Sequence, residues 1–478
     1  MNDKTEDTLR SALKRRAGSI GVGDPHVGVK QRIAALRHRR RRRLALGSAA
    51  VAIVVAAVAL APTLVNSGHR TQTAAKSARP GVLASRLVRD THPSVPQSVI
   101  DELTRANTST AIDFYHQLTA KPGNVFFSPY SITTALGMAA AGARGQTLSQ
   151  MLAVLHDTLP AADFQVATNA LNLALLAPRQ GPGAGATGKA LELELANSVW
   201  SQTGFHVEPA FLDVLARDYG AALNTLDFAS HPEAATTAIN AWVAANTNNL
   251  IRKLFTSLDP ATRLVLVNAV HFKASWLQPF LAANTHDGTF KTAAGTTVTV
   301  PFMHGQVRAT YSAGNGWQAV DLPYIGDASM TVIVPDPGTF SSFERSLDPA
   351  LLARVIGSLA PSDVTLAFPK LQLTDNIDLV PALHALGMKD AFDNADFSGI
   401  TGDRSLAISQ VVHQATVTVD EEGTEAAAAT GIAFYQSAER PVNLTIDRPY
   451  VFLIRDHLTG SILFAGRVTD PTQTQVHQ

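Results

Sequence analysis

Ala415 to Thr430 reads ATVTVDEEGTEAAAAT, and this stretch decides the fold because it begins as a strand and continues into very small side chains. In its first part Val417 and Val419 alternate with Thr416 and Thr418, which is the period-two pattern of a half-buried strand. The sequence therefore predicts a strand with its valines facing a core.

The second part of this stretch follows Gly423 and contains Thr424, a glutamate and four consecutive alanines. None of these side chains is too large to fit between two strands, so the segment can join a sheet as a new strand. The alternative is a short helix, since alanine is the best helix former and Thr424 can cap a helix that ends near Gly431.

The composition describes a packed globular protein, with 478 residues, 46% hydrophobic and 16% charged. Its formal net charge is zero, which implies no general attraction to nucleic acid. The absence of cysteine excludes disulfides, thiolate metal sites and a cysteine nucleophile.

A basic cluster and an apolar run near the N-terminus predict a membrane anchor. Arg37 to Arg43 reads RHRRRRR, and Leu44 to Ala61 carries no charge. These 18 residues span about 27 Å as a helix, which is enough for a hydrocarbon core. The arginine cluster on the N-terminal side of the apolar run indicates a cytoplasmic tail and a folded domain on the other side of the membrane. The alternative is a cleaved signal peptide ending at Ala59–Ala61, although Pro62 is a poor cleavage context.

The chain divides into four predicted parts. Residues 1–43 form a basic cytoplasmic tail, 44–65 the transmembrane anchor, 66–97 a flexible linker outside the membrane, and 98–472 the folded domain. Composition and anchor length suggest a bacterial source.

The folded domain reads as helices first and strands later. Ser128-Pro129 is a good helix start, Leu191 to Leu195 alternates as a strand, and helices are predicted at 208–219 and 232–254. From Arg263 the chain is mainly strands.

Two features end this strand-rich part. A helix is predicted at 377–386 with a left-handed stop at Gly387, and the C-terminal segment forms a hairpin that turns near 458–460. This order predicts an α+β fold, not repeated βαβ units.

Motifs for chemistry are weak. Gly183 to Gly188 matches a nucleotide-binding pattern, but Ala190 lacks the hydroxyl that binds magnesium and a strand follows, so a surface loop is the better interpretation. No G-x-S-x-G or H-E-x-x-H is present, and His413 lies alone in an apolar run. The sequence predicts no enzyme, no cofactor and no metal site.

Four blocks resemble the serpin family, and they stand in serpin order: Asn124–Thr147, Leu266–Phe280, Val411–Thr430 and Arg448–Gln473. The resemblance covers about 375 residues, from roughly 98 to 472. It implies the serpin fold, with several helices packed on three mainly antiparallel β-sheets and an exposed reactive loop at about 421–441.

The resemblance implies a suicide inhibitor of serine-type endopeptidases. The protease cuts the loop and forms an acyl-enzyme, and the cut loop then inserts into the central sheet. About 15 inserted residues move the protease on the order of 50 Å and distort its active site. The uncut fold must therefore be metastable.

The hinge that inserts first resembles residues 421–430. Its members are Glu421, Glu422, Gly423, Thr424, Glu425, Ala426, Ala427, Ala428, Ala429 and Thr430. After insertion Thr424, Ala426, Ala428 and Thr430 would face the buried side of the sheet, and Glu425 would face water. This small-residue pattern is typical of inhibitory members.

Two further groups follow from the resemblance. The shutter, where strands must part, comprises Ser128, Ser131, Asn268 and His413. The breach, where insertion begins, contains Trp276. The alternatives are helix capping for Ser128 and an ordinary core aromatic for Trp276.

The scissile bond falls after Ser437 when counted from the hinge and after Ala438, before Glu439, when counted back from Arg448-Pro449. Both choices favour an elastase-like or subtilisin-like protease. In another register, Tyr435 would suit a chymotrypsin-like and Arg440 a trypsin-like enzyme, and cysteine proteases stay open as targets.

We expect a monomer displayed outside a cell on its anchor, or secreted if the anchor is cleaved. Its expected partners are the target protease and the membrane, without nucleic acid. A serpin-fold binding protein that does not inhibit is the first rival function, and an enzyme with an unrecognised site is the second.

Overall fold

Helices gather in the first half of the described chain and strands in the second. The computed structural model describes residues 81–177, 191–424 and 441–476. Every described residue belongs to one compact unit.

The helices are α3 (Gln97–Leu118), α4 (Pro129–Ala140), α5 (Gly145–Val154), α6 (Ala161–Leu176), α7 (Pro209–Val214), α8 (Pro232–Asn246), α9 (Phe340–Ser346), α10 (Pro349–Ser358), α11 (Val380–Ala385), α12 (Asp390–Asp393) and α13 (Ser398–Thr401). A π-helical turn, Leu215–Tyr219, follows α7.

The strands are β1 (Gly81–Leu83), β2 (Val125–Phe127), β3 (Glu192–Gln202), β4 (Leu223–Leu226), β5 (Leu264–Ser275), β6 (His286–Lys291), β7 (Thr297–Gly314), β8 (Trp317–Pro323), β9 (Ala328–Pro335), β10 (Ala360–Pro369), β11 (Leu371–Asp378), β12 (Ile408–Asp420), β13 (Gly423–Thr424), β14 (Val442–Thr445), β15 (Tyr450–Asp456), β16 (Ile462–Val468) and β17 (Gln475–Val476).

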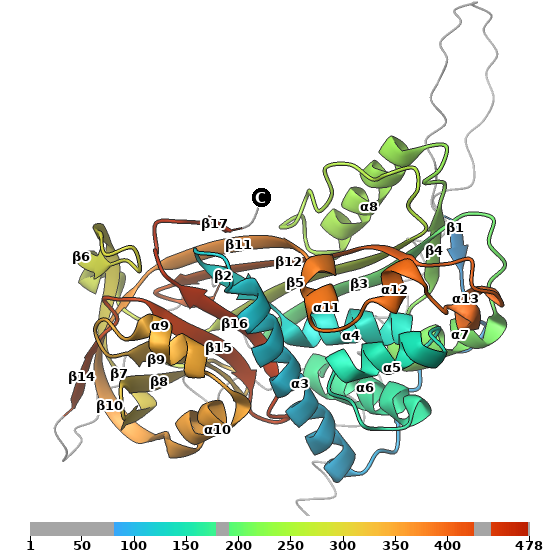
Figure 1. Ribbon diagram of the computed structural model, residues 1–478. Helices are drawn as coiled ribbons and strands as arrows, with labels where there is room; N and C mark the ends of the chain where they lie inside the picture. The colour runs from blue at the N-terminus through green and yellow to red at the C-terminus, as the bar shows by residue number, and fades with distance from the viewer. Residues whose placement is uncertain (1–80, 178–190, 425–440, 477–478) are drawn as a thin grey trace, which may run out of the picture. The chain divides into compact units, whose positions relative to one another are not determined.

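These strands form two large sheets (Figure 1). The central sheet has the order β1-β4-β3-β5-β13-β12-β11-β17, and the second sheet has the order β14-β10-β7-β8-β9-β15-β16-β2, with β6 paired to β7. We expected three sheets. Within the described residues there are two, because the long strand β7 pairs with β6, β10 and β8 and so joins the strands of two expected sheets.

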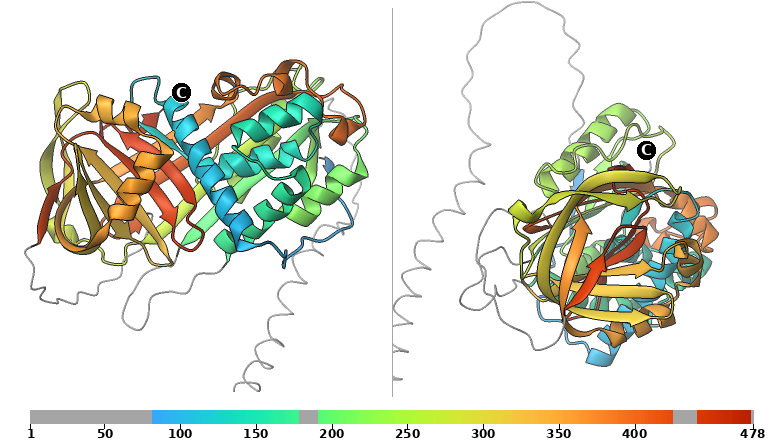
Figure 2. Two further views of the ribbon diagram at one scale, coloured as in Figure 1. Left: turned by 60° about the horizontal axis from the view of Figure 1, so that its bottom comes forward. Right: turned by 90° about the vertical axis from the view of Figure 1, so that its left-hand side faces the viewer.

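The two faces of the central sheet are covered differently. α8 lies on one face, where its apolar side packs on Trp200, Val265 and Val267. Helices α3 to α6 gather on the opposite side, as the blue and teal ribbons in the left view of Figure 2 show. α4 contacts β3 and β5 of the central sheet and also β16 of the second sheet. The main core therefore lies between the two sheets and around α4.

Local signals gave most element positions correctly. The Ser128 hydroxyl caps α4 by accepting from the Ser131 N–H at 3.1 Å. Gly387 has φ 103°, as a left-handed stop requires. The C-terminal hairpin, β15 and β16, turns where expected.

Three boundaries differ from the expectation. α8 ends at Asn246 instead of 254, because Asn248 and Asn249 adopt left-handed backbone with φ 49° and 62°. The helix predicted at 377–386 begins only at Val380, since Ile377 and Asp378 still belong to β11.

The predicted linker is the third difference. Residues 81–97 do not behave as a flexible tether: β1 pairs with β4, and α3 already begins at Gln97. The predicted tail and anchor, residues 1–65, lie outside the described residues, as does the Gly183–Gly188 loop. In the described part of the chain no helix is long and apolar enough to cross a bilayer.

Candidate functional site: the insertion point of the central sheet

The site begins where a two-residue strand enters the central sheet. β13 lies between β5 and β12: Gly423 pairs with Ser275 and Asp420, and Thr424 pairs with Ala274 and Val419. Thr424 is therefore in a strand, and the residues of the alternative helix that follows it lie outside the described residues. Gly423 has φ 145°, and a Cβ there would lie 2.3 Å from the carbonyl oxygen of Ala274, so this position requires glycine.

Beyond β13 the gap in the sheet closes. From Ile408 to Thr416, β12 pairs directly and in parallel with Leu264 to His271 of β5. A strand that continued from β13 would have to separate these two.

Thr424 is completely buried, and its hydroxyl lies 2.8 Å from the Tyr324 hydroxyl. Tyr324 stacks on Trp276 with ring centroids 4.3 Å apart. The indole N–H of Trp276 donates to the Asp420 carbonyl at 2.9 Å. Trp276, the predicted breach residue, thus lies beside β13 and supports the turn before it.

The turn before β13 is held by charge. Lys370 Nζ lies 2.7 Å from one carboxylate oxygen of Glu421, and the Thr285 hydroxyl donates to the other at 2.7 Å. Burial opposes ionisation of Glu421, but these bonds outweigh it and hold its pKa below the usual value. The backbone of Trp276 and Phe280 also donates to the Glu422 and Glu421 carbonyls. The base of the hinge is therefore fixed on both sides.

The predicted shutter residues meet below the hinge, on the side where β5 and β12 pair. Asn268 Nδ2 donates to Ser131 Oγ and to Asn197 Oδ1, both at 2.6 Å. His413 Nδ1 is hydrogen-bonded to Asn268 Oδ1, and the Ser128 N–H donates to His413 Nε2 at 3.0 Å. The structure thus brings together all four.

His413 is buried and uncharged in this arrangement. Burial lowers the pKa of His413 to about 3. A neutral ring with its proton on Nδ1 donates to Asn268 and accepts from Ser128, so both nitrogens are satisfied. A second proton on Nε2 would leave the Ser128 N–H without its acceptor.

Sequence reasoning missed Asn197, Tyr324 and Lys370. Asn197 lies in β3 as one residue of the alternating run that follows Leu191, so its strand was recognised but its contact was not. Tyr324 contacts a residue 100 positions away, and no short-range pattern could have identified it. The hinge from Glu425 to Thr430 and the candidate scissile residues lie outside the described residues.

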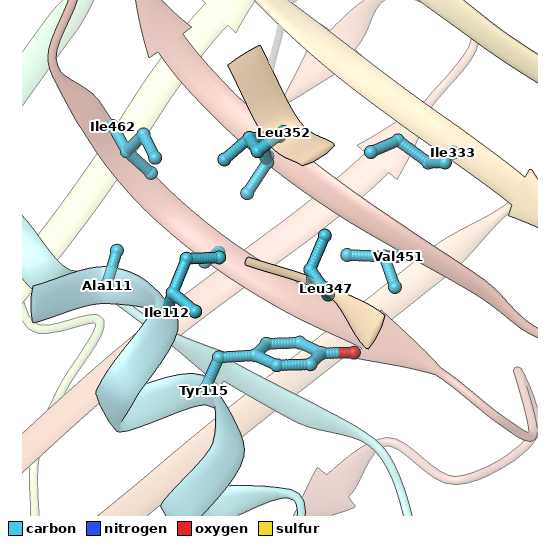
Figure 3. Close-up of a pocket in the computed structure, with 10 residues that line it drawn as sticks. Ala111, Ile112, Tyr115, Ile333, Leu347, Leu352, Val451 and Ile462 are labelled. Carbon is cyan, nitrogen blue, oxygen red and sulfur yellow. The ribbon is translucent and has the colours of Figure 1, made fainter. Parts of the chain in front are cut away.

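An apolar cavity of about 10 Å³ lies under the second sheet, between α3, β9, β15 and β16. Figure 3 shows Ile112, Tyr115 and Leu347 among the side chains around it. This volume is about that of one water probe, and an apolar cavity of this size stays dry. Within the described ranges, no group of three metal-ligating side chains was found.

Comparison with known proteins agrees with this geometry. Residues 105–471 match the family described as Serpin (serine protease inhibitor). A leukocyte elastase inhibitor of Sus scrofa is 35% identical over 389 residues, which cover 78% of this chain and all of that protein. An uncharacterised serpin-like protein of Thermococcus kodakarensis is 36% identical over 397 residues, covering 80% of this chain and 91% of its own.

A solved structure gives the same result. Human thyroxine-binding globulin has a TM-score of 0.72 at 30% identity and covers 78% of this chain and 100% of its own. The fold is α+β, and the short strand β13 lies between β5 and β12 of its central sheet. Together with the comparisons, this shows that the chain belongs to the serpin family and has the serpin fold. The family description is that of protease inhibitors, not of enzymes.

Proposed function

We propose that this chain is an inhibitory serpin that traps a serine protease by inserting its cut reactive loop into the central sheet. The observation that carries the proposal is β13. Gly423 and Thr424 already occupy the first positions of a new strand between β5 and β12. The hinge therefore begins at the end of the gap between β5 and β12 through which the cut loop would insert.

The register of β13 defines where the following residues would go. Thr424 pairs antiparallel with Val419 of β12 and with Ala274 of β5. In an antiparallel pairing, each further residue of the inserting strand lies opposite a residue one position earlier in both neighbours. Continued insertion would place Ala426 beside Val417 and Phe272, and Ala428 beside Ala415 and Val270. These partners are buried, so alanine at both positions lets the strand enter without a steric or desolvation cost.

Thr430 would arrive at a polar position. The same register sets it opposite His413 and Asn268, which now bond to each other across the β5–β12 junction. Its hydroxyl can accept from one and donate to the other, so each keeps a hydrogen-bond partner after the strands separate. Because the Thr430 hydroxyl replaces the lost His413–Asn268 hydrogen bond, neither buried side chain is left with an unsatisfied polar group in the inserted form.

Loop insertion must be faster than hydrolysis of the acyl-enzyme for the protease to stay covalently bound. The residues that enter first are small, and in the described part of the chain the path is closed by strand pairing, by the shutter contacts and by the bond from Asn376 to the Leu254 carbonyl. The native fold is then kinetically trapped, and the inserted form gains a full strand of backbone hydrogen bonds.

We also propose an elastase-like or subtilisin-like target, because Ser437 and Ala438 are small. The elastase inhibitor among the relatives is consistent with this class. We further propose that residues 44–65 anchor the body outside a membrane. The charge asymmetry between Arg37–Arg43 and the apolar run supports this proposal.

Incubation with elastase, subtilisin and trypsin tests inhibition. We expect a covalent complex with elastase or subtilisin that survives boiling in detergent, and mass spectrometry of the released fragment should place the cut after Ser437 or Ala438. Clean cleavage without any complex would favour a serpin-fold protein that does not inhibit.

A melting experiment tests the insertion step separately. After a cut in the reactive loop the domain should melt at a higher temperature than the intact chain, because the loop has joined the sheet. An unchanged or lower melting temperature would refute insertion. Membrane fractionation of cells that express the full chain, compared with a chain lacking residues 44–65, tests the anchor.

A further inference from the structure

The two outermost strands of the central sheet come from segments outside the residues that match the family. β1 pairs with β4 at one edge and β17 pairs with β11 at the other (Figure 1). The family match covers residues 105–471, whereas β1 is formed by 81–83 and β17 by 475–476. Both edges of the sheet are therefore covered by segments outside residues 105–471.

An uncovered edge strand presents free N–H and C=O groups to which a strand of another molecule can add. β11 has eight residues, Leu371–Asp378, so its edge is about 26 Å long. β4 has four residues and offers a shorter edge. The β11 edge is thus the stronger acceptor of the two.

β17 divides the β11 edge at its middle. It pairs in parallel with Thr374 and Asp375, and the Thr374 N–H donates to the Thr474 carbonyl at 2.9 Å. Three residues of β11 stay on either side of this pair. Each remaining stretch is shorter than an ordinary strand, so a two-residue cover is sufficient to prevent continuous pairing.

A buried asparagine fixes the tail in place before it reaches the edge. Asn124 has no exposed surface, and its Nδ2 donates to the carbonyls of Asp470 at 2.7 Å and Gln473 at 2.9 Å. Its Oδ1 accepts from the Thr469 N–H at 2.7 Å and the Asp470 N–H at 3.0 Å. The path of the tail toward β11 is thus set by interior contacts.

The segment after β1 is fixed in the same way. Asn169 is also fully buried, and it donates to the Asp90 carbonyl at 2.7 Å and accepts from Arg89 Nε at 3.0 Å. The Asp90 N–H donates to the Arg217 carbonyl at 2.9 Å. One interior asparagine therefore holds each cover to the body.

We propose that β1 and β17 are edge covers that keep the central sheet from adding a strand of a second copy of this chain, with β17 as the more important. The strand-accepting centre of the sheet is a separate feature. The covers act without any protease, so this proposal and the proposed inhibition can fail independently.

The test compares two shortened chains. A chain that ends at Gln473 loses β17 and keeps every Asn124 contact, whereas a chain that ends at Val476 keeps β17 and is the matched control. Analytical ultracentrifugation of both, in one detergent buffer and over a hundredfold range of concentration, should give oligomers of at least twice the monomer mass for the first chain only.

Two substitutions in the full chain complete the test. Val476→Pro removes the N–H that the parallel register directs at the Thr374 carbonyl and should also produce oligomers; it decides the matter if the shortened chain fails to fold. Val82→Pro in β1, with Val82→Thr as its control, should give a weaker effect because β4 is short.

Two outcomes would overturn the proposal. The first is that the chain ending at Gln473 and the Val476→Pro variant both sediment as monomers throughout the range. The second is that their oligomers fail to form once the reactive loop has been cut beforehand, because that would place the contact in the centre of the sheet and not at its edge.

Discussion

Replacing Thr424 with arginine would place a charge at the first buried position of the inserting strand. Thr424 has no exposed surface, and its hydroxyl contacts Tyr324, which is itself stacked on Trp276. Asp321, the carboxylate whose charge acts on Tyr324, already pairs with Arg455 at 2.9 Å, so it is not free to neutralise an arginine at position 424.

The magnitude follows from these contacts. Burying an unpaired charge costs several kcal/mol, and even about 3 kcal/mol added to the insertion barrier slows that step on the order of 10²-fold. In the uncut protein the variant loses the Tyr324 hydrogen bond, which costs about 1 kcal/mol. β13 should therefore leave the sheet while the rest of the fold stays intact.

The assay measures how many inhibitor molecules are consumed for each protease molecule trapped. Thr424→Arg should be cleaved as a substrate and form little complex that survives boiling in detergent. Thr424→Ser, which keeps the hydroxyl, and Glu425→Arg, which changes the neighbour expected to face water, should both inhibit normally. If Thr424→Arg traps the protease at the wild-type ratio, burial at this position does not control insertion.

Three further predictions concern the path below the hinge. Because burial lowers the pKa of His413 from its ordinary value of 6.5 to about 3, the unfolded chain takes up a proton first as the pH falls, so the stability that depends on this residue is full above pH 6.5 and falls toward pH 3. Urea unfolding should show a loss of about 2 kcal/mol between pH 6.5 and 5, absent in His413→Gln, and an equal loss in both would contradict the assignment. Asn376→Ala removes the 3.1 Å hydrogen bond from Asn376 Nδ2 of β11 to the Leu254 carbonyl, in the segment after α8. It should speed insertion severalfold, as measured by the rate of complex formation with the protease. An unchanged rate would show that this bond does not slow insertion. Thr430→Val should lower the melting temperature of the cut form but not of the intact form, and an equal shift in both would exclude its proposed role at the shutter.

The sequence predicted those parts of the site that depend on near neighbours. The alternation of Val417 and Val419 with threonines is fixed by strand geometry, and both valines are buried in β12. The cap at Ser128 depends only on the first turn of α4. Such features need three or four consecutive residues, and the fold could be assigned once several of them occurred in one order.

Contacts between distant strands could not be predicted in the same way. Lys370 reaches Glu421 only because β11 and β12 are neighbours in the sheet, and nothing local marks either residue as a partner. The segment around Arg89 was interpreted as a linker because its composition is that of one. It is ordered by Asn169 and by the Arg217 carbonyl, which come from α6 and the π-helical turn. Composition measures the average preference of a segment and cannot register two specific acceptors elsewhere in the chain.

The polar shutter raises the question of why a sheet that is proposed to open carries buried hydrogen bonds where β5 and β12 pair. An apolar junction between β5 and β12 would pack as well, and it would lose its contacts gradually as the strands part. Asn268 and His413 instead lose a directional bond in one step, and the separated pair pays the full desolvation cost until new partners arrive. That cost opposes spontaneous opening in the uncut protein, where β12 and β5 pair directly at His413 and Asn268. In the cut protein the proposed insertion would bring the Thr430 hydroxyl to the same place. The arrangement therefore opposes opening most strongly when no strand follows, which is the selectivity that a metastable inhibitor requires.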